Sequence, residues 1–378
     1  MRFVSLKPST MIGRSVMQAF DEKVSFISFV RLWWGCSYKD SDEAASLALK
    51  FSKNIPNSKI LYFFKYWMFR AQYNWTRRYF EKHPDAGALC WNGLNGSRRV
   101  FIEAARHAGA HVVIFESAPL PGRLTIDTKG VNFANSLPRN SQFYINWQLK
   151  NPQHQHSWIS VRQSIVSRMS SKNKNVKQLT CSDTTLDQPY IFVPLQVQTD
   201  TQIKVFGGCI KSVEDFVCLL DKYATELPHG WILRVKEHPS SPVPYRLDEL
   251  IKNRSRWVVD NTTDTMQLVR HSKAVVTVNS SVGLEALFFG KPVITVGQAF
   301  YGFEDISYAI QDPDELRKLF ADPIGIFKFK EREVTAFLNY LCVVYYPQVD
   351  INNGIVVSID PIWLKSFKDS MYSQSREI

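Results

Sequence analysis

The chain has 378 residues, of which 45% are hydrophobic and 21% are charged, and it carries a formal net charge of +11. Because one hydrophobic core seldom organises more than about 300 residues, this length predicts two domains, and the composition excludes a chain that is disordered throughout. The positive charge indicates an anionic partner, and nucleic acid, acidic lipid and a phosphorylated or carboxylated sugar all meet that requirement.

The first 85 residues are dominated by an aromatic and basic stretch from Lys59 to Phe80, which we predict to be helical. In one interpretation this helix lies on the inner leaflet of a membrane beside a lipid-linked acceptor. In the other it is a buried helix with solvated basic edges. We favour the second interpretation, because apolar residues occur nearly all round the helix and not on one face.

A regular pattern begins at residue 86. It predicts a strand over 88–91, a glycine-containing turn over 92–96, a helix over 97–108 and a strand over 110–115, which together form a parallel βαβ unit. The loop Glu116–Arg123 starts at the carboxyl end of the last strand. In open α/β sheets that edge is where ligands bind.

A second alternating series follows a polar and basic stretch at 150–188 that is typical of an inter-domain connection. We predict strands over 190–195, 231–235, 257–259, 274–278 and 293–296, and helices over 213–226, 265–271 and 282–289. This series predicts another doubly wound parallel sheet.

The predicted fold class is therefore α/β, with two Rossmann-like domains. The first domain spans residues 1–185 and includes the aromatic and basic extension, and the second spans 186–350. Residues 351–378 are expected to contain a helix, near 360–372, that packs back on the first domain.

The six cysteines are scattered and include no C-x-x-C pair, and no apolar run is long enough for a signal peptide or a membrane span. We therefore expect a cytoplasmic protein, with peripheral contact to the inner face of the inner membrane as a further option. Neither a disulfide framework nor a zinc site is indicated.

The sharpest local signal is a buried strand that delivers Ser280 and Ser281 to the start of a helix. Backbone N–H groups and the positive end of the helix dipole favour an anion there, so the segment predicts a phosphate site. Glu285 follows one turn later, where it is placed to accept hydrogen bonds from ribose hydroxyls. The alternative is that a serine is simply the helix N-cap.

A second signal is the strand end Arg234–Pro239. Lys236 and His238 are two residues apart, so they project from the same side of an extended chain, and we predict that both meet one anion. A structural role for the His-Pro pair is the alternative.

A third signal is a pair of carboxylates, Glu116 and Asp200, each just beyond a predicted strand. Glycosyl transfer with retention needs one carboxylate as nucleophile and another as acid and base. An acidic residue at a strand edge also commonly forms a turn or a cap. Asp127 is a competing candidate, although its spacing before Gly130 suits a β-turn.

Taken in this order, these segments resemble the capsule polysaccharide biosynthesis family that contains the retaining β-Kdo glycosyltransferases. The motifs that carry the resemblance are the loop from Glu116 through Val131, Gln196–Asp200, Lys236–Pro239, and Ser280–Pro292 with the following 297–301. The resemblance implies a GT-B-like architecture, with two Rossmann-like domains facing a central cleft. It also implies CMP-Kdo as donor and retention of configuration through a covalent sugar adduct.

By motif position, the resemblance makes Asp200 the nucleophile and Glu116 the acid/base. The first domain would bind a glycan or lipid-linked glycan acceptor, through Asn92, and the second the nucleotide sugar. The residues expected to bind the donor are Lys236, His238, Pro239, Ser280, Ser281, Gly283, Glu285 and Arg123. Arg123, Lys236 and Lys291 are expected to supply the positive charge that stabilises departing CMP, so neither a metal nor another cofactor is expected.

Three alternatives stay open. The fold also suits an inverting transferase or an epimerase that uses another nucleotide sugar. A non-catalytic binding protein of polysaccharide export would need the cleft but not both carboxylates. Nucleic acid is not expected as a partner, because the basic residues are dispersed and no recognised nucleic-acid motif is present. The sequence also contains no G-x-S-x-G, Walker A or H-E-x-x-H motif.

Overall fold

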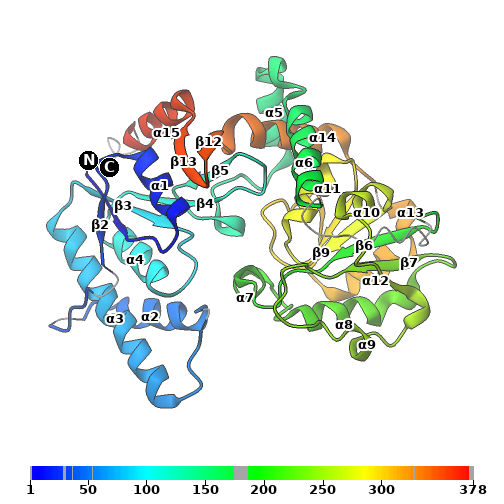
Figure 1. Ribbon diagram of the computed structural model, residues 1–378, viewed down its shortest axis with the longest axis horizontal. Coiled ribbons are helices and arrows are strands. Elements are labelled where there is room, and N and C mark those ends of the chain that lie inside the picture. Colours follow the sequence, from blue (N-terminus) through cyan, green and yellow to red (C-terminus); the bar gives the residue numbers. More distant parts are fainter. Residues whose placement is uncertain are drawn as a thin grey trace. The chain divides into compact units, whose positions relative to one another are not determined.

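The computed structural model describes residues 2–28, 31–35, 37–52, 54–173, 186–326 and 328–373. The chain forms two compact units (Figure 1). Unit 1 comprises Met1–Ser136 and Val344–Ile378, and unit 2 comprises Leu137–Val343. The division lies earlier in the chain than the expected boundary at residue 185. The GT-B-like arrangement of the units about a cleft stays a prediction.

Unit 1 is built on a five-stranded sheet with the strand order β2-β1-β3-β4-β5. The strands are β1 (Arg2–Leu6), β2 (Ser25–Ile27), β3 (Ala86–Trp91), β4 (Val112–Ser117) and β5 (Leu124–Asp127). The first four run parallel, and β5 is antiparallel to β4. The chain order reverses between β1 and β3, which makes their carboxyl ends the switch point where open α/β sheets bind ligands.

Helices cover both faces of this sheet, as Figure 1 shows. They are α1 (Met11–Phe20), α2 (Ser41–Lys50), α3 (Lys59–Lys82), α4 (Gly96–His107) and α15 (Pro361–Ser373). On one face, Phe20 of α1 and Met371 of α15 pack with Phe115 of β4 in one core. On the other side, α2, α3 and α4 share a second core around Tyr73. Largely apolar strands that are covered on both faces are typical of parallel sheets.

The C-terminal segment belongs to unit 1. A hairpin of β12 (Val349–Asn352) and β13 (Ile355–Ile359) precedes α15. The backbone N–H of Val356 donates to the Oγ of Ser15 in α1 at 3.0 Å, and the rings of Trp363 and Phe367 stack in the same core. The helix predicted near 360–372 is therefore present, and it packs on elements of the N-terminal half.

Helix α3 includes the aromatic and basic stretch, and only its later turns are buried. Phe69, Tyr73 and Phe80 are at most 2% exposed, because α2 and α4 pack along that part of the helix. The residues from Ile60 to Phe64 are all exposed. The helical prediction is thus confirmed, and the interpretation as a buried helix is wrong for its first turns.

Unit 2 contains a six-stranded parallel sheet with the order β11-β10-β9-β6-β7-β8. The strands are β6 (Tyr190–Pro194), β7 (Ile232–Lys236), β8 (Trp257–Val259), β9 (Ala274–Thr277), β10 (Val293–Thr295) and β11 (Tyr308–Ala309). Numbered within the unit, this is the 3-2-1-4-5-6 order of a Rossmann fold, with its switch point between β6 and β9. The predicted fold class is therefore confirmed.

The helices that follow these strands are α7 (Thr201–Phe206), α8 (Val213–Tyr223), α9 (Leu247–Leu250), α10 (Thr265–His271), α11 (Ser281–Phe288), α12 (Pro313–Ala321) and α13 (Pro323–Ile326). Apolar residues of α8 and α12 form the main core with one face of the sheet. Figure 1 shows α10 and α11 on the opposite face.

Three further helices explain where the unit boundary lies. They are α5 (Ser141–Lys150), α6 (Ser157–Asn173) and α14 (Glu331–Tyr340). Tyr144 of α5 is fully buried against Phe337 and Tyr340 of α14. The polar stretch predicted as a connection is thus helical over α6 and part of unit 2, whereas residues 174–185 lie outside the described residues.

Candidate active site

Two amides join the strand-end loops at the switch point of unit 2. Gln196 follows β6 and Asn279 follows β9, and both side chains are buried. The Nε2 of Gln196 donates to the Oδ1 of Asn279 at 2.9 Å, and the backbone N–H of Asn279 donates back to the Oε1 of Gln196 at 3.2 Å. Although 83 residues separate them in sequence, the pair fixes the loop after β6 to the start of α11.

Asp200 is held by the first of these amides, Gln196, and by the start of α7. Its Oδ2 accepts from the Nε2 of Gln196 at 3.1 Å, and its Oδ1 accepts from the backbone N–H of Gln202 at 2.8 Å as the N-cap of α7. The capping role that a strand-edge acid commonly has is therefore present. The structure brings Asp200 together with Asn279, the residue before Ser280.

Ser280 and Ser281 stand at the start of α11, as predicted. The Oγ of Ser280 accepts from the backbone N–H of Val282 at 3.2 Å, so Ser280 is the N-cap, and Ser281 is the exposed first residue of the helix. The N-cap alternative is thus confirmed for Ser280. The positive end of the helix dipole still lies at the carboxyl edge of the sheet, where an anion is favoured.

Gly283 lets α11 approach Tyr301 and β9 closely. A Cβ atom at this position would lie 2.3 Å from the Oη of Tyr301 and 3.1 Å from the Cγ2 of Thr277. The Tyr301 hydroxyl donates to the backbone carbonyl of Ser280, and burial first, then the charge of Glu285, raises the pKa of Tyr301. Gly283 therefore permits this close packing, and its part in donor binding stays a prediction.

Glu285 is 3% exposed inside α11. The sequence pattern placed it one turn into the helix, and the structure agrees with that placement. Its carboxylate is close enough to Tyr301 for its charge to raise the pKa of that hydroxyl. Hydrogen bonding of Glu285 to a ribose stays a prediction.

Lys236 ends β7 with its ammonium group bound to a neighbouring loop. The Nζ donates to the backbone carbonyls of Asn261 at 3.2 Å and Thr263 at 2.5 Å, and burial lowers the pKa of Lys236. The same loop is fixed by Asp260, which accepts from the buried Arg234 at 2.9 Å. Lys236 thus has a structural role, and its part in donor binding stays a prediction.

His238 lies in the turn that follows β7, with the exposed Pro239 next to it. Its Nδ1 accepts from the backbone N–H of Ser240 at 3.1 Å. In a neutral ring the proton is then on Nε2, the nitrogen suited to donate to a phosphate oxygen. Both Lys236 and His238 have partners within the protein, and their shared hold on one anion stays a prediction.

Tyr245 connects the His238 turn to the Gln196 loop. Its Oη accepts from the backbone N–H of His238 at 3.3 Å and donates to the backbone carbonyl of Gln196 at 3.0 Å. Gln196, Tyr245 and Asn279 are the site residues that sequence reasoning missed. Their signal was weak, because amides and tyrosines near strand ends acquire meaning only when the strand order is known.

In unit 1, Asn92 and Glu116 come together at the carboxyl ends of β3 and β4. The Nδ2 of Asn92 donates to the Oε2 of Glu116. The Oε1 of Glu116 accepts from the backbone N–H of Ser117 at 3.0 Å. Asn92 has a φ of 68°, a left-handed conformation that asparagine adopts more readily than most residues. The predicted acceptor residue therefore touches the predicted acid/base.

Asp127 is a structural residue. It is 1% exposed, and its carboxylate accepts from the backbone N–H groups of Lys129, Gly130 and Ser136 at 2.6, 3.0 and 2.8 Å. It also accepts from the hydroxyl of Tyr345 at 2.8 Å. These bonds confirm the turn interpretation and leave the carboxylate enclosed.

Two of the predicted cations are bound to backbone carbonyls. Arg123 donates to the carbonyl of Tyr346 at 2.6 Å, within unit 1, and its donor-binding role stays a prediction. Lys291 donates to the carbonyl of Ser272 at 3.0 Å. Because Lys291 precedes β10, it lies at the amino-terminal edge of the parallel sheet, opposite to Ser281. Its predicted place beside the departing CMP is therefore wrong.

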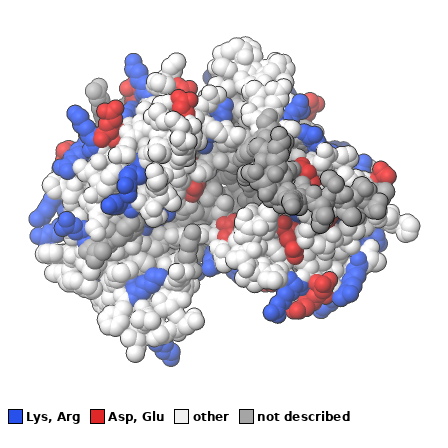
Figure 2. All heavy atoms as spheres, viewed as in Figure 1, with Lys and Arg blue, Asp and Glu red and all other residues white. Residues whose placement is uncertain are grey.

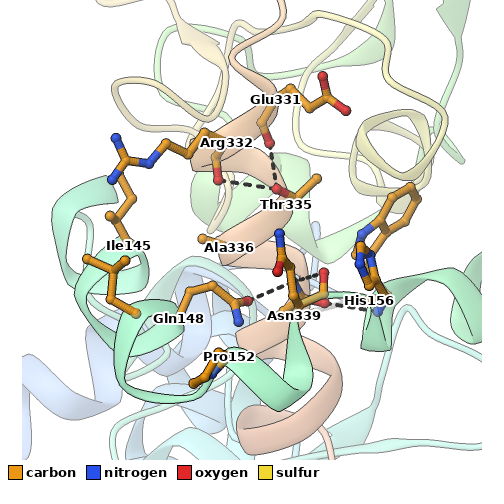
Figure 3. Close-up of a pocket in the computed structure, with 12 residues that line it drawn as sticks. Ile145, Gln148, Pro152, His156, Glu331, Arg332, Thr335, Ala336 and Asn339 are labelled. Atoms are coloured by element: carbon orange, nitrogen blue, oxygen red, sulfur yellow. Dashed lines mark hydrogen bonds between the residues drawn. The ribbon is translucent and has the colours of Figure 1, made fainter.

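A cavity of about 700 Å³ lies among α5, α6 and α14 in unit 2 (Figure 3). Asn339 on its wall accepts from the backbone N–H of Trp158 at 3.1 Å and donates to the Oε1 of Gln148 at 2.8 Å. These bonds join the three helices. None of the predicted site residues lines this cavity.

Two further findings concern the described residues alone. No three or more His, Cys, Asp or Glu side chains gather closely enough to hold a metal ion. No helix in this part of the chain combines the length and the apolar character needed to cross a membrane.

Comparison with known proteins shows similarity to one protein family and to the fold of solved structures. The family described as capsule polysaccharide biosynthesis protein matches residues 148–318. Protein FixF of Sinorhizobium fredii is 30% identical over 250 residues, which cover 62% of this chain and 58% of FixF. The capsule polysaccharide export protein KpsS of Escherichia coli is 24% identical over 283 residues, covering 62% of this chain and 72% of KpsS. This chain thus matches less than two thirds of FixF.

Among solved structures, KpsC of Thermosulfurimonas dismutans, described as a β-Kdo 2,7 transferase, matches 99% of this chain and 100% of its own. The TM-score is 0.52 at 16% identity, so the likeness shows the fold. The family match includes Asp200, His238 and Ser281 but neither Asn92 nor Glu116.

Proposed function

We propose that this chain, which the family described as capsule polysaccharide biosynthesis protein matches over residues 148–318, is a glycosyltransferase that transfers Kdo from CMP-Kdo to a bacterial surface glycan. The observation that carries the proposal is the switch point of unit 2. There, Gln196 and Asn279 bind the Asp200 loop to the start of α11, which is where doubly wound sheets bind nucleotides. The fold shared with KpsC, a β-Kdo 2,7 transferase, supports it.

In the proposed donor complex, CMP-Kdo lies at the carboxyl edge of the unit 2 sheet. Its phosphate is bound at the start of α11, by Ser281 and backbone N–H groups, and by the Nε2–H of His238. The anionic phosphate and sugar carboxylate suit a site rich in donors and cations. We propose that these groups stabilise departing CMP without a metal.

The proposed reaction is a double displacement. A carboxylate oxygen of Asp200 attacks the anomeric carbon while the bond from that carbon to the phosphate oxygen breaks, and CMP leaves with the electron pair. An acceptor hydroxyl then attacks the same carbon, its proton passes to Glu116, and the bond to Asp200 breaks. Two inversions give net retention. Asn92 orients Glu116 through its amide.

We further propose that the protein works in the cytoplasm, at the inner face of the inner membrane, where a glycan or lipid-linked glycan acceptor is presented. The net charge of +11 supports a location beside the anionic lipids of that membrane face.

The second candidate is a non-catalytic binding protein of polysaccharide export. Two observations favour it. Both carboxylate oxygens of Asp200 are already engaged, by Gln196 and by the N-terminus of α7, and the relative KpsS is named an export protein.

Mass spectrometry after incubation with CMP-Kdo tests the proposal. We expect a mass increase of one Kdo residue, mapped to the peptide that contains Asp200, and a product with retained configuration by NMR. Release of CMP without an adduct, with inverted configuration, would indicate an inverting transferase instead. Inertness with all acceptors would favour the binding protein.

Asp200→Asn is the sharpest variant, because asparagine caps a helix as well as aspartate does. We expect it to fold like the wild type and to lose both adduct and transfer. Asp200→Ala should lose transfer and, with the cap gone, about 1 kcal/mol of stability. Near-normal turnover by Asp200→Asn would remove Asp200 from the nucleophile role.

A further inference from the structure

The first turns of α3 expose an unusual run of apolar side chains. Ile60, Leu61, Tyr62, Phe63 and Phe64, which we call the apolar tip, have exposed fractions of 67, 59, 44, 59 and 66%. Elsewhere among the described residues, exposed apolar side chains such as those of Ile324 and Ile362 do not form a run of this kind. In Figure 1 the helix begins at the lower end of unit 1 and continues beside α2. Exposed apolar surface of this extent marks an interaction site.

The direction of the side chains indicates what the tip contacts. An α-helix has about 3.6 residues per turn, so five consecutive residues point to every side of it. A helix that docks in a protein groove uses one face, with anchors three and four residues apart. A tip that is apolar on every side can bury all five side chains only in a medium that surrounds it, as lipid does.

The charge around the tip supports the same conclusion. Residues 50–65 contain four lysines and no Asp or Glu. Lys59 is exposed and directly precedes the tip, and Lys65 follows it. Figure 2 shows Lys and Arg side chains together with uncharged surface at the lower end of unit 1 in this view. Anionic lipid headgroups attract such a segment, whereas a neutral bilayer gives it no electrostatic gain.

We propose that the apolar tip inserts into the interfacial layer of a membrane that contains anionic lipids, while the lysines around it contact the headgroups. The proposal rests on the peripheral location within the proposed function and names the element responsible. It does not depend on the sugar transfer itself.

The later turns of α3 suit an anchor of this kind. Phe69 and Tyr73 are buried with α2 and α4, so the tip is carried on a helix fixed to the body of unit 1. A tip held in this way inserts without the ordering cost that a disordered segment would meet on binding.

Flotation of the full chain with vesicles tests the proposal. One set of vesicles holds phosphatidylglycerol and phosphatidylcholine in equal amounts, and the other holds phosphatidylcholine alone. We expect binding to the first set, which weakens as salt is added. The double variant Phe63→Ser/Phe64→Ser should bind at least about tenfold more weakly, and Lys59→Glu should weaken binding mainly at low salt.

Ile362→Ser, at an 84% exposed position of α15 in the same unit, is the matched control and should bind like the wild type. All the changed side chains are exposed, so the variants should keep their thermal stability. Vesicle binding by the double variant equal to that of the wild type would overturn the proposal. So would a lipid-free dimer of the wild type that the double variant abolishes, because the tip would then be an interface between copies.

Release of CMP from CMP-Kdo onto a water-soluble acceptor, measured in parallel, separates this inference from the sugar transfer. If the double variant turns over CMP-Kdo normally but the wild type does not bind vesicles, only the membrane proposal fails. If vesicles bind and no donor is consumed, only the transferase proposal fails.

Discussion

For the substitution Gly283→Ala, helix propensity predicts a gain in stability and close packing predicts a loss. Alanine favours a helix over glycine by about 1 kcal/mol. At this position, however, the new Cβ would lie 2.3 Å from the Oη and 2.9 Å from the Cζ of Tyr301. Overpacking of this kind costs about 1–3 kcal/mol, and a displaced Tyr301 loses its hydrogen bond to Ser280, about 1 kcal/mol more. The expected net destabilisation is about 1–3 kcal/mol.

Equilibrium unfolding in urea measures this loss of stability. The shift of the unfolding midpoint gives the change in free energy, provided that the dependence of that free energy on urea concentration is unchanged. Tyr301→Phe supplies the control, because it removes the oxygen that the new Cβ would meet first. The double variant should then be more stable than the sum of the single changes predicts, by about 1 kcal/mol. Because α11 starts at Ser281, Gly283→Ala should also raise the KM for the donor. If Gly283→Ala equals or exceeds the wild type in stability, the close approach of α11 to Tyr301 is refuted.

Two further predictions concern the two units separately. Asn92→Gly keeps the left-handed backbone but removes the amide that binds Glu116, so the rate of transfer should fall by roughly tenfold or more. Asn92→Asp should move the acidic limb of the pH–rate profile to higher pH, because a second carboxylate raises the pKa of its neighbour. An unchanged profile would contradict the orienting role of Asn92. Asp260→Ala leaves Arg234 buried without its partner and should cost about 3–5 kcal/mol in urea unfolding, whereas a loss below 1 kcal/mol would mean that water reaches the pair. Burial raises the pKa of Asp260, but hydrogen bonds from Thr263 and Arg234 outweigh it and hold that pKa below its ordinary value of 3.8. The stability this provides is complete above about pH 4 and is lost as pH falls further, so Asp260→Asn should show a shallower acid dependence than the wild type.

The βαβ series was predictable because its signal is local. Buried parallel strands appear as short apolar runs, and β3, β4, β6, β7, β9 and β10 were all found from such runs. Strand β1, which lies inside the unit 1 sheet between β2 and β3, was not found. Its partner β3 lies some eighty residues away, and its own pattern, with Arg2 at the start and Ser5 inside, gives little indication of burial.

Tertiary context determined the parts that the sequence pattern could not predict. Apolar residues all round α3 fit both a buried helix and an exposed tip, and only the extent of α2 and α4 decides where burial ends. Likewise, a serine before a helix is a cap or a ligand-binding group according to what approaches it. Asp200 was found as a candidate from its place after a strand, but the bond from Gln196 to Asn279, which fixes the Asp200 loop to α11, follows from β6 lying beside β9.

The hydrogen bonds of the unit 2 site also bear on how its activity should depend on pH. Gln196, Asn279 and Tyr245 connect the loops after β6, β7 and β9. Amides do not titrate, and burial raises the pKa of Tyr245 above its usual value. This framework therefore keeps its hydrogen bonds unchanged from acid to mildly alkaline solution. A change in transfer rate near neutral pH must then arise from groups that meet the substrates, and His238 is the residue that the proposed donor complex brings to the phosphate.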